Sequence, residues 1–226
     1  RLFKNSGIVE LPAIGNIELT TSIVEFINGS PAIRRVALPT LKFARDAWNA
    51  ARDCRSLEAV KIGDLTECTG LDSAVEGNPK LRSVEIGNCP KVDRMERFAY
   101  GCSVLESIRI GLGNRLLRFN EAFNGCSSLR TIEGHLDLTL VNQISNTTFN
   151  RCTSLEEVRI KSLKVDLNLQ HSDNLSVESV KYLVDNLQKS TGKTISLASA
   201  WQTAHPAEAR ECAQKAAAKG FTLNFR

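Results

Sequence analysis

Seven cysteines and three histidines are the side chains of this sequence that could bind a metal or act as nucleophiles. The sequence contains no Cys-x-x-Cys pair, and none of the histidines lies at zinc-finger spacing from a cysteine. Four cysteines, Cys54, Cys102, Cys126 and Cys152, instead occupy one position of a repeat. A free cysteine in a core behaves as a small apolar side chain. We therefore expect these four to be buried, reduced and metal-free, stacked in one packed column.

The remaining candidates give no catalytic pattern. Cys68 and Cys89 lie in variable parts of adjacent repeats and could approach each other, although we expect no disulfide; Cys212 is expected inside a helix. A catalytic triad could only assemble in space, because nucleophile signatures are missing beside His135, His171 and His205. Phosphate loops, HExxH motifs and paired-carboxylate motifs are also missing. We predict no catalytic, cofactor or metal residues, and the sequence assigns no partner-binding residues.

The element that positions these residues is a repeat of fixed length. Its first residue, which we call the anchor, recurs in steps of 24, 24, 24, 24, 24 and 26 residues, at Ser6, Ser30, Cys54, Asn78, Cys102, Cys126 and Cys152. A fixed period in the low twenties is typical of a solenoid, in which each repeat packs against its neighbours. The sequence thus predicts one elongated stack of at least six turns.

From Ser30 onward, the third residue after each anchor is aliphatic and the sixth is β-branched. The eighth is aliphatic in every repeat but one. This pattern predicts short parallel strands near residues 33–38, 57–62, 81–86, 105–110, 129–134 and 155–160. Gly134 breaks the last apolar column. The residue before most anchors is Gly, Asn or Asp, which tolerate a left-handed backbone.

These residues resemble the BspA-type leucine-rich repeat, which has a phenylalanine, a Gly-Cys pair and then Ser-Leu-x-x-Ile-x-Ile. Phe123-Asn-Gly125-Cys126-Ser-Ser-Leu129 and Phe149-Asn-Arg-Cys152-Thr-Ser-Leu155 match this pattern. The resemblance covers about residues 1–163, and Ser6, Ser30 and Asn78 replace the cysteine as small-for-small changes. It implies an α/β solenoid and a role in adhesion to host proteins and other cells.

Residues 164–226 are expected to cap the stack with the order helix, strand, helix, strand. Ser176 can cap the first helix, Thr194–Leu197 is a strand, Pro206 begins the second helix, and Phe221–Phe225 is a last strand. We expect both strands to continue the parallel ladder. The segment is also similar to a tail of leucine-rich-repeat proteins from gut bacteria and prophages, through Leu175-Ser-Val-Glu-Ser179 and Lys219-Gly-Phe-Thr222.

Charge argues against polyanion binding. The net charge is only +4, basic residues are scattered, and aromatic residues are 6% of the chain. One outward strand position alternates in sign, as Lys61, Glu85, Arg109, Glu133 and Arg159. A self-neutralised face has little potential to attract a charged polymer. We expect no binding of nucleic acid, and a partner that uses the variable half-repeats or the rim of the strand face.

The leading functional prediction is a non-enzymatic, extracellular protein-binding or adhesion module of a bacterial surface protein, monomeric and without a cofactor or a membrane span. The alternatives are a phage or prophage tail-associated binding protein, an accessory domain of a larger enzyme, and a structural spacer. Because the chain begins at Arg1, inside a repeat, we expect a piece of a longer secreted protein from which a signal peptide has been removed.

Overall fold

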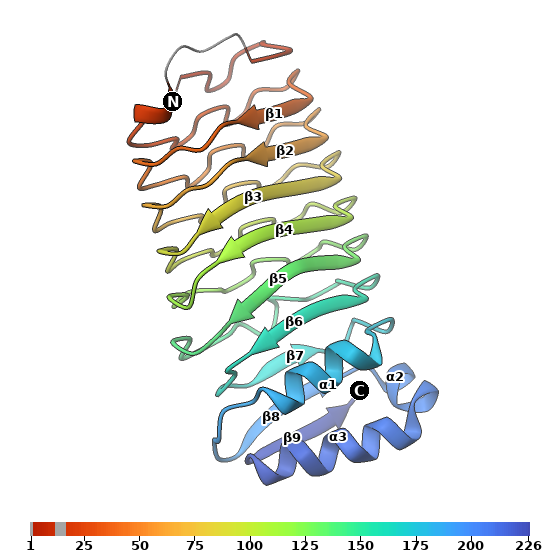
Figure 1. Ribbon diagram of the computed structural model, residues 1–226. Helices are drawn as coiled ribbons and strands as arrows, with labels where there is room; N and C mark the ends of the chain where they lie inside the picture. Colours follow the sequence, from red (N-terminus) through yellow and green to blue (C-terminus); the bar gives the residue numbers. More distant parts are fainter. Residues whose placement is uncertain (1, 12–16) are drawn as a thin grey trace.

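The computed structural model describes residues 2–11 and 17–226 as a stack of similar coils (Figure 1). Six parallel strands form one sheet in chain order. They are β1 (Arg35–Leu38), β2 (Ala59–Ile62), β3 (Ser83–Cys89), β4 (Ser107–Leu112), β5 (Thr131–Asp137) and β6 (Glu157–Lys161). A short 3-10 helix, η1 (Ile17–Leu19), precedes them. The predicted repeat solenoid with a parallel ladder is confirmed.

The apolar columns stack in register and form the core. Val36 pairs with Val60, and the same column continues through Val84, Ile108, Ile132 and Val158. All of these side chains are buried. All six strands begin two residues later than predicted, because the aliphatic residue three positions after each anchor lies in a turn before the strand. The Leu57 amide, for example, donates to the carbonyl of Cys54 at 3.0 Å.

Left-handed residues end each coil. The residue before every anchor has a positive φ, as predicted: Asn5, Gly29, Asp53, Gly77, Gly101, Gly125 and Arg151. A second left-handed column was not predicted and consists of Glu25, Asn49, Ser73, Arg97 and Glu121. Glutamate and arginine do not favour this conformation, so the residue types of the second column gave no sequence signal.

The anchor side chain is a hydrogen-bond donor as well as a packed residue. From the second anchor onward, it donates to the carbonyl three residues before the preceding anchor. In the cysteine repeats the bonds run from Cys54 to Ile27 at 3.0 Å, Cys102 to Val75 at 3.0 Å, Cys126 to Ala99 at 3.1 Å and Cys152 to Phe123 at 3.2 Å. Ser30 and Asn78 make the corresponding bonds at 2.6 and 2.7 Å. The replacements at the anchor therefore share a donor group, not only a small size.

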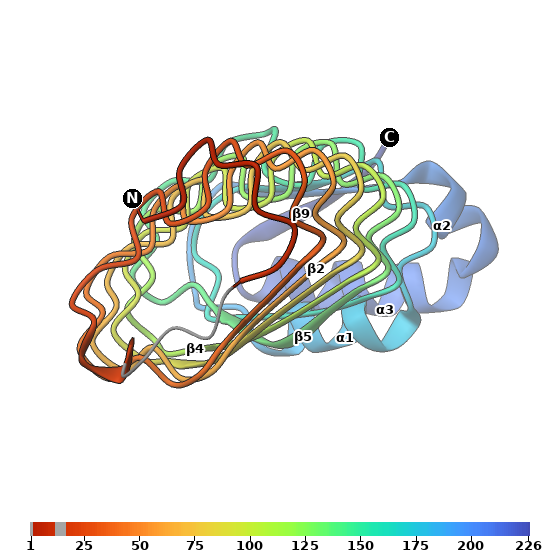
Figure 2. The same cartoon turned by 90° about the horizontal axis from the view of Figure 1, so that it is seen from above.

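A second ladder runs along the opposite side of the coils. Isolated parallel bridges join Ser22, Asp46, Gly70, Arg94 and Arg118. Further along, the same side carries a three-stranded parallel sheet of β7 (Leu167–Leu169), β8 (Lys193–Leu197) and β9 (Phe221–Phe225). Figure 2, which looks down the stack, shows β9 on the side opposite β4 and β5.

The C-terminal segment contains the predicted helices and strands, with two additions. The helices are α1 (Val177–Asp185), α2 (Ser199–Ala204) and α3 (Pro206–Ala218). Ser176 caps α1 by accepting from the amide of Ser179 at 3.1 Å, and α3 begins at Pro206. Strand β7 and helix α2 were not predicted. The division of the chain at residue 163 stays a prediction.

One detail of the expected cap was wrong. The C-terminal strands do not extend the six-stranded sheet, which ends at β6. Helix α1 occupies the next place, because its capping region bonds the exposed edge of β6. The amide of Ser176 donates to Glu156 O at 2.9 Å, and Val158 N donates to Ser179 Oγ at 3.1 Å. The strands β8 and β9 extend the second ladder instead.

Candidate binding surface

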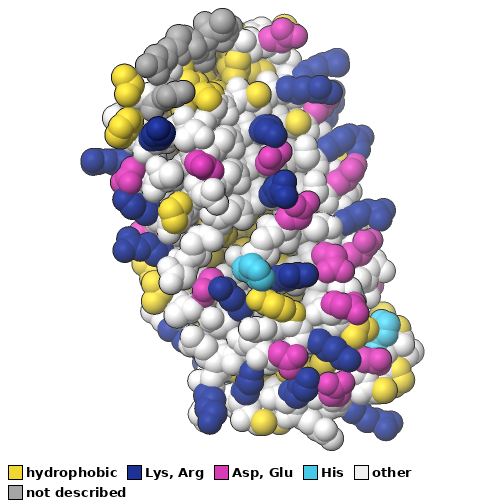
Figure 3. Space-filling model, in the orientation of Figure 1, with side chains coloured by type: hydrophobic (Ala, Val, Ile, Leu, Met, Phe, Trp, Pro, Cys, Tyr) yellow, Lys and Arg dark blue, Asp and Glu magenta, His cyan; other side chains and the backbone are white. Residues whose placement is uncertain are grey.

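Two rows of alternating charge cover the outer side of the six-stranded sheet, which we call the strand face. The predicted row pairs Lys61 with Glu85 and Arg109 with Glu133, each at 3.1 Å. A parallel row, not predicted, lies at the fourth residue after each anchor: Arg34, Glu58, Arg82, Glu106, Arg130 and Glu156. In this row the ion pairs are Arg34–Glu58 at 3.9 Å, Arg82–Glu106 at 2.6 Å and Arg130–Glu156 at 3.2 Å. Figure 3 shows the two signs intermixed over this face.

From Glu58 and Lys61 onward, the two rows also carry opposite signs within each repeat, so the strand face is a checkerboard of charge. Exposed ion pairs of this kind contribute at most about 1 kcal/mol each. Their main effects are to favour the correct register and to cancel the field of the face. The unpredicted row had a signal in the sequence, namely strict alternation at the repeat period.

The last step of the predicted alternation was wrong. Arg159 lies opposite His135, not opposite Glu133. The register shifts between Ile132 and His135, because the 26-residue repeat places its two extra residues inside β5. Gly134 adopts a φ of 101° there. Leu136, paired with Ile160, fills the apolar column that Gly134 appeared to break.

The same repeat interrupts the ladder on the opposite side. The bridges between described residues end at Arg118. Side chains connect the coils beyond this point. Asn120 Oδ1 accepts from the Ser145 amide at 2.8 Å, and Asn168 Nδ2 donates to Asn146 O at 3.2 Å. The buried Thr148 accepts from the amide of Glu121 at 3.2 Å and donates to Phe119 O, also at 3.2 Å.

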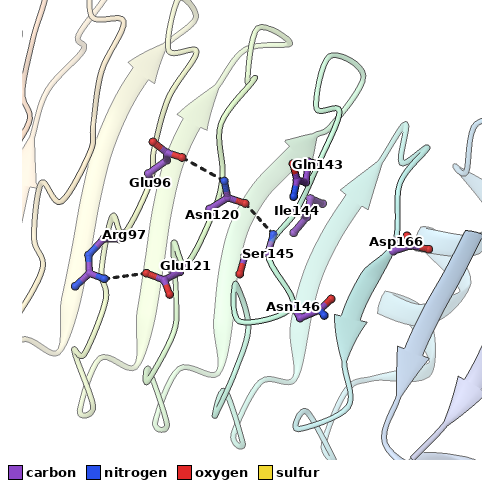
Figure 4. Close-up of a pocket in the computed structure, with 9 residues that line it drawn as sticks. All are labelled: Glu96, Arg97, Asn120, Glu121, Gln143, Ile144, Ser145, Asn146 and Asp166. Atoms are coloured by element: carbon purple, nitrogen blue, oxygen red, sulfur yellow. Dashed lines mark hydrogen bonds and ion pairs between the residues drawn. The ribbon is translucent and has the colours of Figure 1, made fainter.

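A polar groove of about 770 Å³ lies where this ladder opens (Figure 4). We call it the amide groove. Its lining residues are Glu96, Arg97, Asn120, Glu121, Gln143, Ile144, Ser145, Asn146 and Asp166. Figure 4 shows them on four successive coils, with Asp166 at the far end. Glu96 accepts from Asn120 Nδ2 at 3.2 Å, so even the ends of these side chains are held in place.

Arg97 forms a fixed wall of the groove. Its guanidinium bonds the buried Glu76 at 2.7 and 3.2 Å and Glu121 at 2.8 Å, and it lies 3.8 Å from the ring centre of Tyr100. Burial alone would raise the pKa of Glu76, but hydrogen bonds from Arg97 and Ser73 outweigh it, so the pKa lies below its ordinary value. The charge of Arg97 is thus balanced inside the protein, and the groove offers amides and carboxylates to a partner.

The cysteines are structural. All seven are buried and free, which confirms the predicted burial of the anchor column. Burial raises the pKa of Cys102 and Cys152 to about 12 and that of Cys126 well above its ordinary value. A thiol is nucleophilic only as a thiolate, so these groups act as donors and packing residues. Cys68 and Cys89 are also free thiols, and Cys212 lies in α3 as predicted.

The histidines are not brought together. His135 contacts Tyr182, with 3.0 Å between Nδ1 and the hydroxyl oxygen, whereas His171 contacts Gln170 and His205 lies against Trp201. Over residues 2–11 and 17–226, no group of three or more His, Cys, Asp or Glu side chains could hold a metal ion. In the same part of the chain, no helix has the length and apolar character needed to cross a membrane.

Comparison with known families identifies the repeat. A family model described as the BspA type leucine rich repeat region matches residues 48–155 and 100–172, with six copies. No curated protein and no solved structure matches the chain significantly.

Proposed function

The chain belongs to the BspA-type leucine-rich repeat family, and we propose that it is a non-enzymatic adhesion module that binds proteins outside a bacterial cell. A solenoid presents a long rigid surface on which each repeat contributes a few side chains. The chain lacks the arrangement of nucleophile, base and orienting group that catalysis needs, within the residues described. Rigid display of side chains is the property that its architecture supports best.

The observation that carries the proposal is the amide groove. It lies on the variable half-repeats, where the backbone bridges of the second ladder stop at Arg118. Side chains rather than paired backbone are exposed there. Its volume of about 770 Å³ falls in the range of sites that hold a small ligand or a few side chains of a partner. Amide and carboxylate groups held by neighbouring coils lose little freedom on binding, which favours affinity.

The strand face supports the proposal by contrast. Its charges are paired along and across the coils, so a partner would have to break ion pairs to gain new ones. Lys61 and Arg109, for example, each hold a glutamate at 3.1 Å. The amide groove has fewer such pairs, and the side-chain amides of Gln143 and Asn146 on its lining make no hydrogen bond to other described residues. We therefore place the main protein contact on the side of the stack opposite the strand face.

An extracellular location on the bacterial surface is part of the same proposal and follows from the family. The phage-tail alternative is supported only by the C-terminal similarity, and the spacer and enzyme-accessory alternatives by no particular residue. These alternatives predict different results in one binding experiment.

The experiment measures binding of the purified chain to a panel of immobilised extracellular-matrix proteins and to intact host and bacterial cells. Gln143→Trp would fill the groove from its exposed rim, and Asn142→Trp adds the same bulk at the neighbouring exposed position, which does not line the groove. We expect saturable binding that Gln143→Trp weakens by about tenfold or more, equivalent to about 1.4 kcal/mol, and that Asn142→Trp leaves unchanged. Absence of binding to every surface would refute adhesion, and equal effects of the two variants would remove the groove from the contact.

A further inference from the structure

The strand face has one position where its charge pattern fails. In the row that begins with Lys61, each charge faces one of opposite sign until β6, where the bulge in β5 substitutes His135 for Glu133 as the neighbour of Arg159. Neighbouring strands lie about 4.8 Å apart. Arg159 is exposed, and among the described residues it has no ion pair with a carboxylate. In a regular repeat a glutamate would lie opposite this cation. The two inserted residues place a histidine there instead.

The nearby carboxylates are already engaged. Glu133 is held by Arg109 at 3.1 Å, and Asp137 by Lys161 at 3.3 Å. Glu157, two residues before Arg159 on the same strand, accepts from the hydroxyl of Ser179 at 3.3 Å. Glu133 and Asp137 are thus paired with cations, whereas Glu157 is held by a neutral hydroxyl and keeps its charge; among the described residues none of the three forms an ion pair with Arg159.

Helix α1 orients the two donors. The hydroxyl oxygen of Tyr182 lies 3.0 Å from His135 Nδ1, and the rings are 5.5 Å apart. The Tyr182 ring also lies 5.8 Å from Arg159 Cζ, within the range of a cation–π contact. When Tyr182 donates to Nδ1, the imidazole hydrogen is on Nε2, the nitrogen that does not face Tyr182. The guanidinium and Nε2 then form a pair of neighbouring donors held by one tyrosine.

A hollow beside His135 leaves open space at the edge of the site. It has a volume of about 430 Å³, and of Arg159, His135 and Tyr182 only His135 lines it. The lining residues are Ile110, Gly111, Leu112, Gly113, Asn114, Gly134, His135, Asp137 and Lys161. Glycines leave the backbone open to close approach.

We propose that Arg159, His135 and Tyr182 form a carboxylate-binding site at the C-terminal edge of the strand face, which takes an aspartate or glutamate side chain of the protein partner. The planar guanidinium can hold both oxygens of a carboxylate, and His135 Nε2 can donate to one of them. The paired charges of the neighbouring strands limit the site to a single acidic group. The inference rests on the proposed function only for the source of that group.

The test is a titration of the isotope-labelled chain with sodium glutarate at constant ionic strength, followed by nuclear magnetic resonance. We expect saturable shifts of the Gly134 and His135 amides and of the Arg159 side chain, with a dissociation constant in the millimolar range. Arg159→Gln should weaken binding by about tenfold or more, and His135→Gln by a smaller factor. Arg35→Gln is the matched control, because Arg35 is also exposed on the strand face but lies in β1, five strands away.

Shifts that do not saturate, or an equal loss of binding in Arg35→Gln, would refute the site. A parallel titration with inorganic phosphate identifies the anion: tighter binding of phosphate than of glutarate would refute the carboxylate assignment. The titration involves no protein partner. Its failure would therefore remove this site and leave the adhesion proposal standing, whereas a failed adhesion experiment would leave the titration result intact.

Discussion

Asn78 is the anchor whose replacement should be most informative. It is fully buried, and its side-chain amide donates to the carbonyls of Ala51 and Val75, both at 2.7 Å. Its Oδ1 accepts from the amide of Cys54 at 2.8 Å. Val75 O has a second donor in the Cys102 thiol at 3.0 Å. Removing the Asn78 side chain therefore affects mainly two groups, the amide of Cys54 and the carbonyl of Ala51.

The magnitude follows from these two groups. A buried polar group that loses its partner costs about 1–3 kcal/mol, so the loss of two partners in Asn78→Ala should lower the free energy of unfolding by roughly 4 kcal/mol, the middle of a range of about 2–6 kcal/mol. The loss would be near the lower end of this range if the Cys54 amide moved to donate to Ala51 O, so that the two groups satisfied each other. The Cys102 amide already makes the corresponding bond to Ala99 O, at 3.1 Å. Asn78→Cys restores the donor found at other anchors and should cost at most about 1 kcal/mol.

Asn78→Asp tests whether the buried side chain must donate hydrogen bonds, because aspartate has nearly the same size as asparagine but lacks the amide hydrogens. The introduced carboxylate could still accept from Cys54 N, but it would face two carbonyl oxygens without a hydrogen to donate. Burial of this charge should make it the least stable variant at neutral pH. Its folded-state pKa would be raised above the unfolded value. The loss should therefore shrink as the pH falls and the carboxyl group becomes protonated.

The measurements are urea unfolding followed by circular dichroism and hydrogen exchange at the Cys54 amide, which reports the local bond. Cys126→Ala is the control, because it removes one thiol donor while Ala99 O keeps the Cys102 amide. An Asn78→Ala variant within about 1 kcal/mol of the parent, a lower bound for an unpaired group, would contradict this reasoning. So would an Asn78→Asp variant as stable as the parent at neutral pH.

Four further predictions concern charge, backbone and thiols. Arg151→Gly should raise the urea midpoint by the equivalent of about 0.5–1 kcal/mol, because Arg151 has a φ of 61° where four other repeats have glycine. Glu76→Gln should lower stability at pH 7, and the difference from the parent should vanish in acid. The lowered pKa of Glu76 means that its contribution is present above the ordinary value of 4.5 and is lost as the pH falls through the folded pKa. Reversal of both Glu85 and Glu133 to lysine should cost at most about 2 kcal/mol in total, and less at high salt, as thermal unfolding at two salt concentrations would show. A thiol reagent should modify none of the seven cysteines in the native protein and all of them in denaturant without reductant, whereas missing thiols would reveal disulfides.

The sequence predicted what the repeat enforces in every copy. Apolar columns have to face one core, so their spacing specified the strands and, up to the bulge in β5, their register. The left-handed turn before each anchor was visible because glycine, asparagine and aspartate are selected by backbone sterics. The helices at Ser176 and Pro206 carried local capping signals.

The rest depended on contacts that local patterns do not encode. Glu121 and Arg97 adopt left-handed conformations because the coil requires them, whatever their own preferences. The place of α1 beside β6 is decided by hydrogen bonds at an open strand edge, where the Ser176 amide donates to Glu156 O and Ser179 Oγ accepts from the Val158 amide. The step of 26 was visible in the spacing of Cys126 and Cys152, but spacing does not say where in the coil two residues are inserted.

That insertion connects the two candidate surfaces. On one side of the stack it forms the bulge at Gly134, which separates Glu133 from Arg159 and leaves the arginine beside His135. On the other side the bridge column stops at Arg118, and amide side chains replace backbone pairing along the groove. A regular repeat satisfies its own backbone and charges, and so has little to offer a partner. A single longer coil leaves polar groups unmatched on both sides at once. Function in this chain is therefore expected where the period changes, because repetition elsewhere has already paired the groups that a ligand would need.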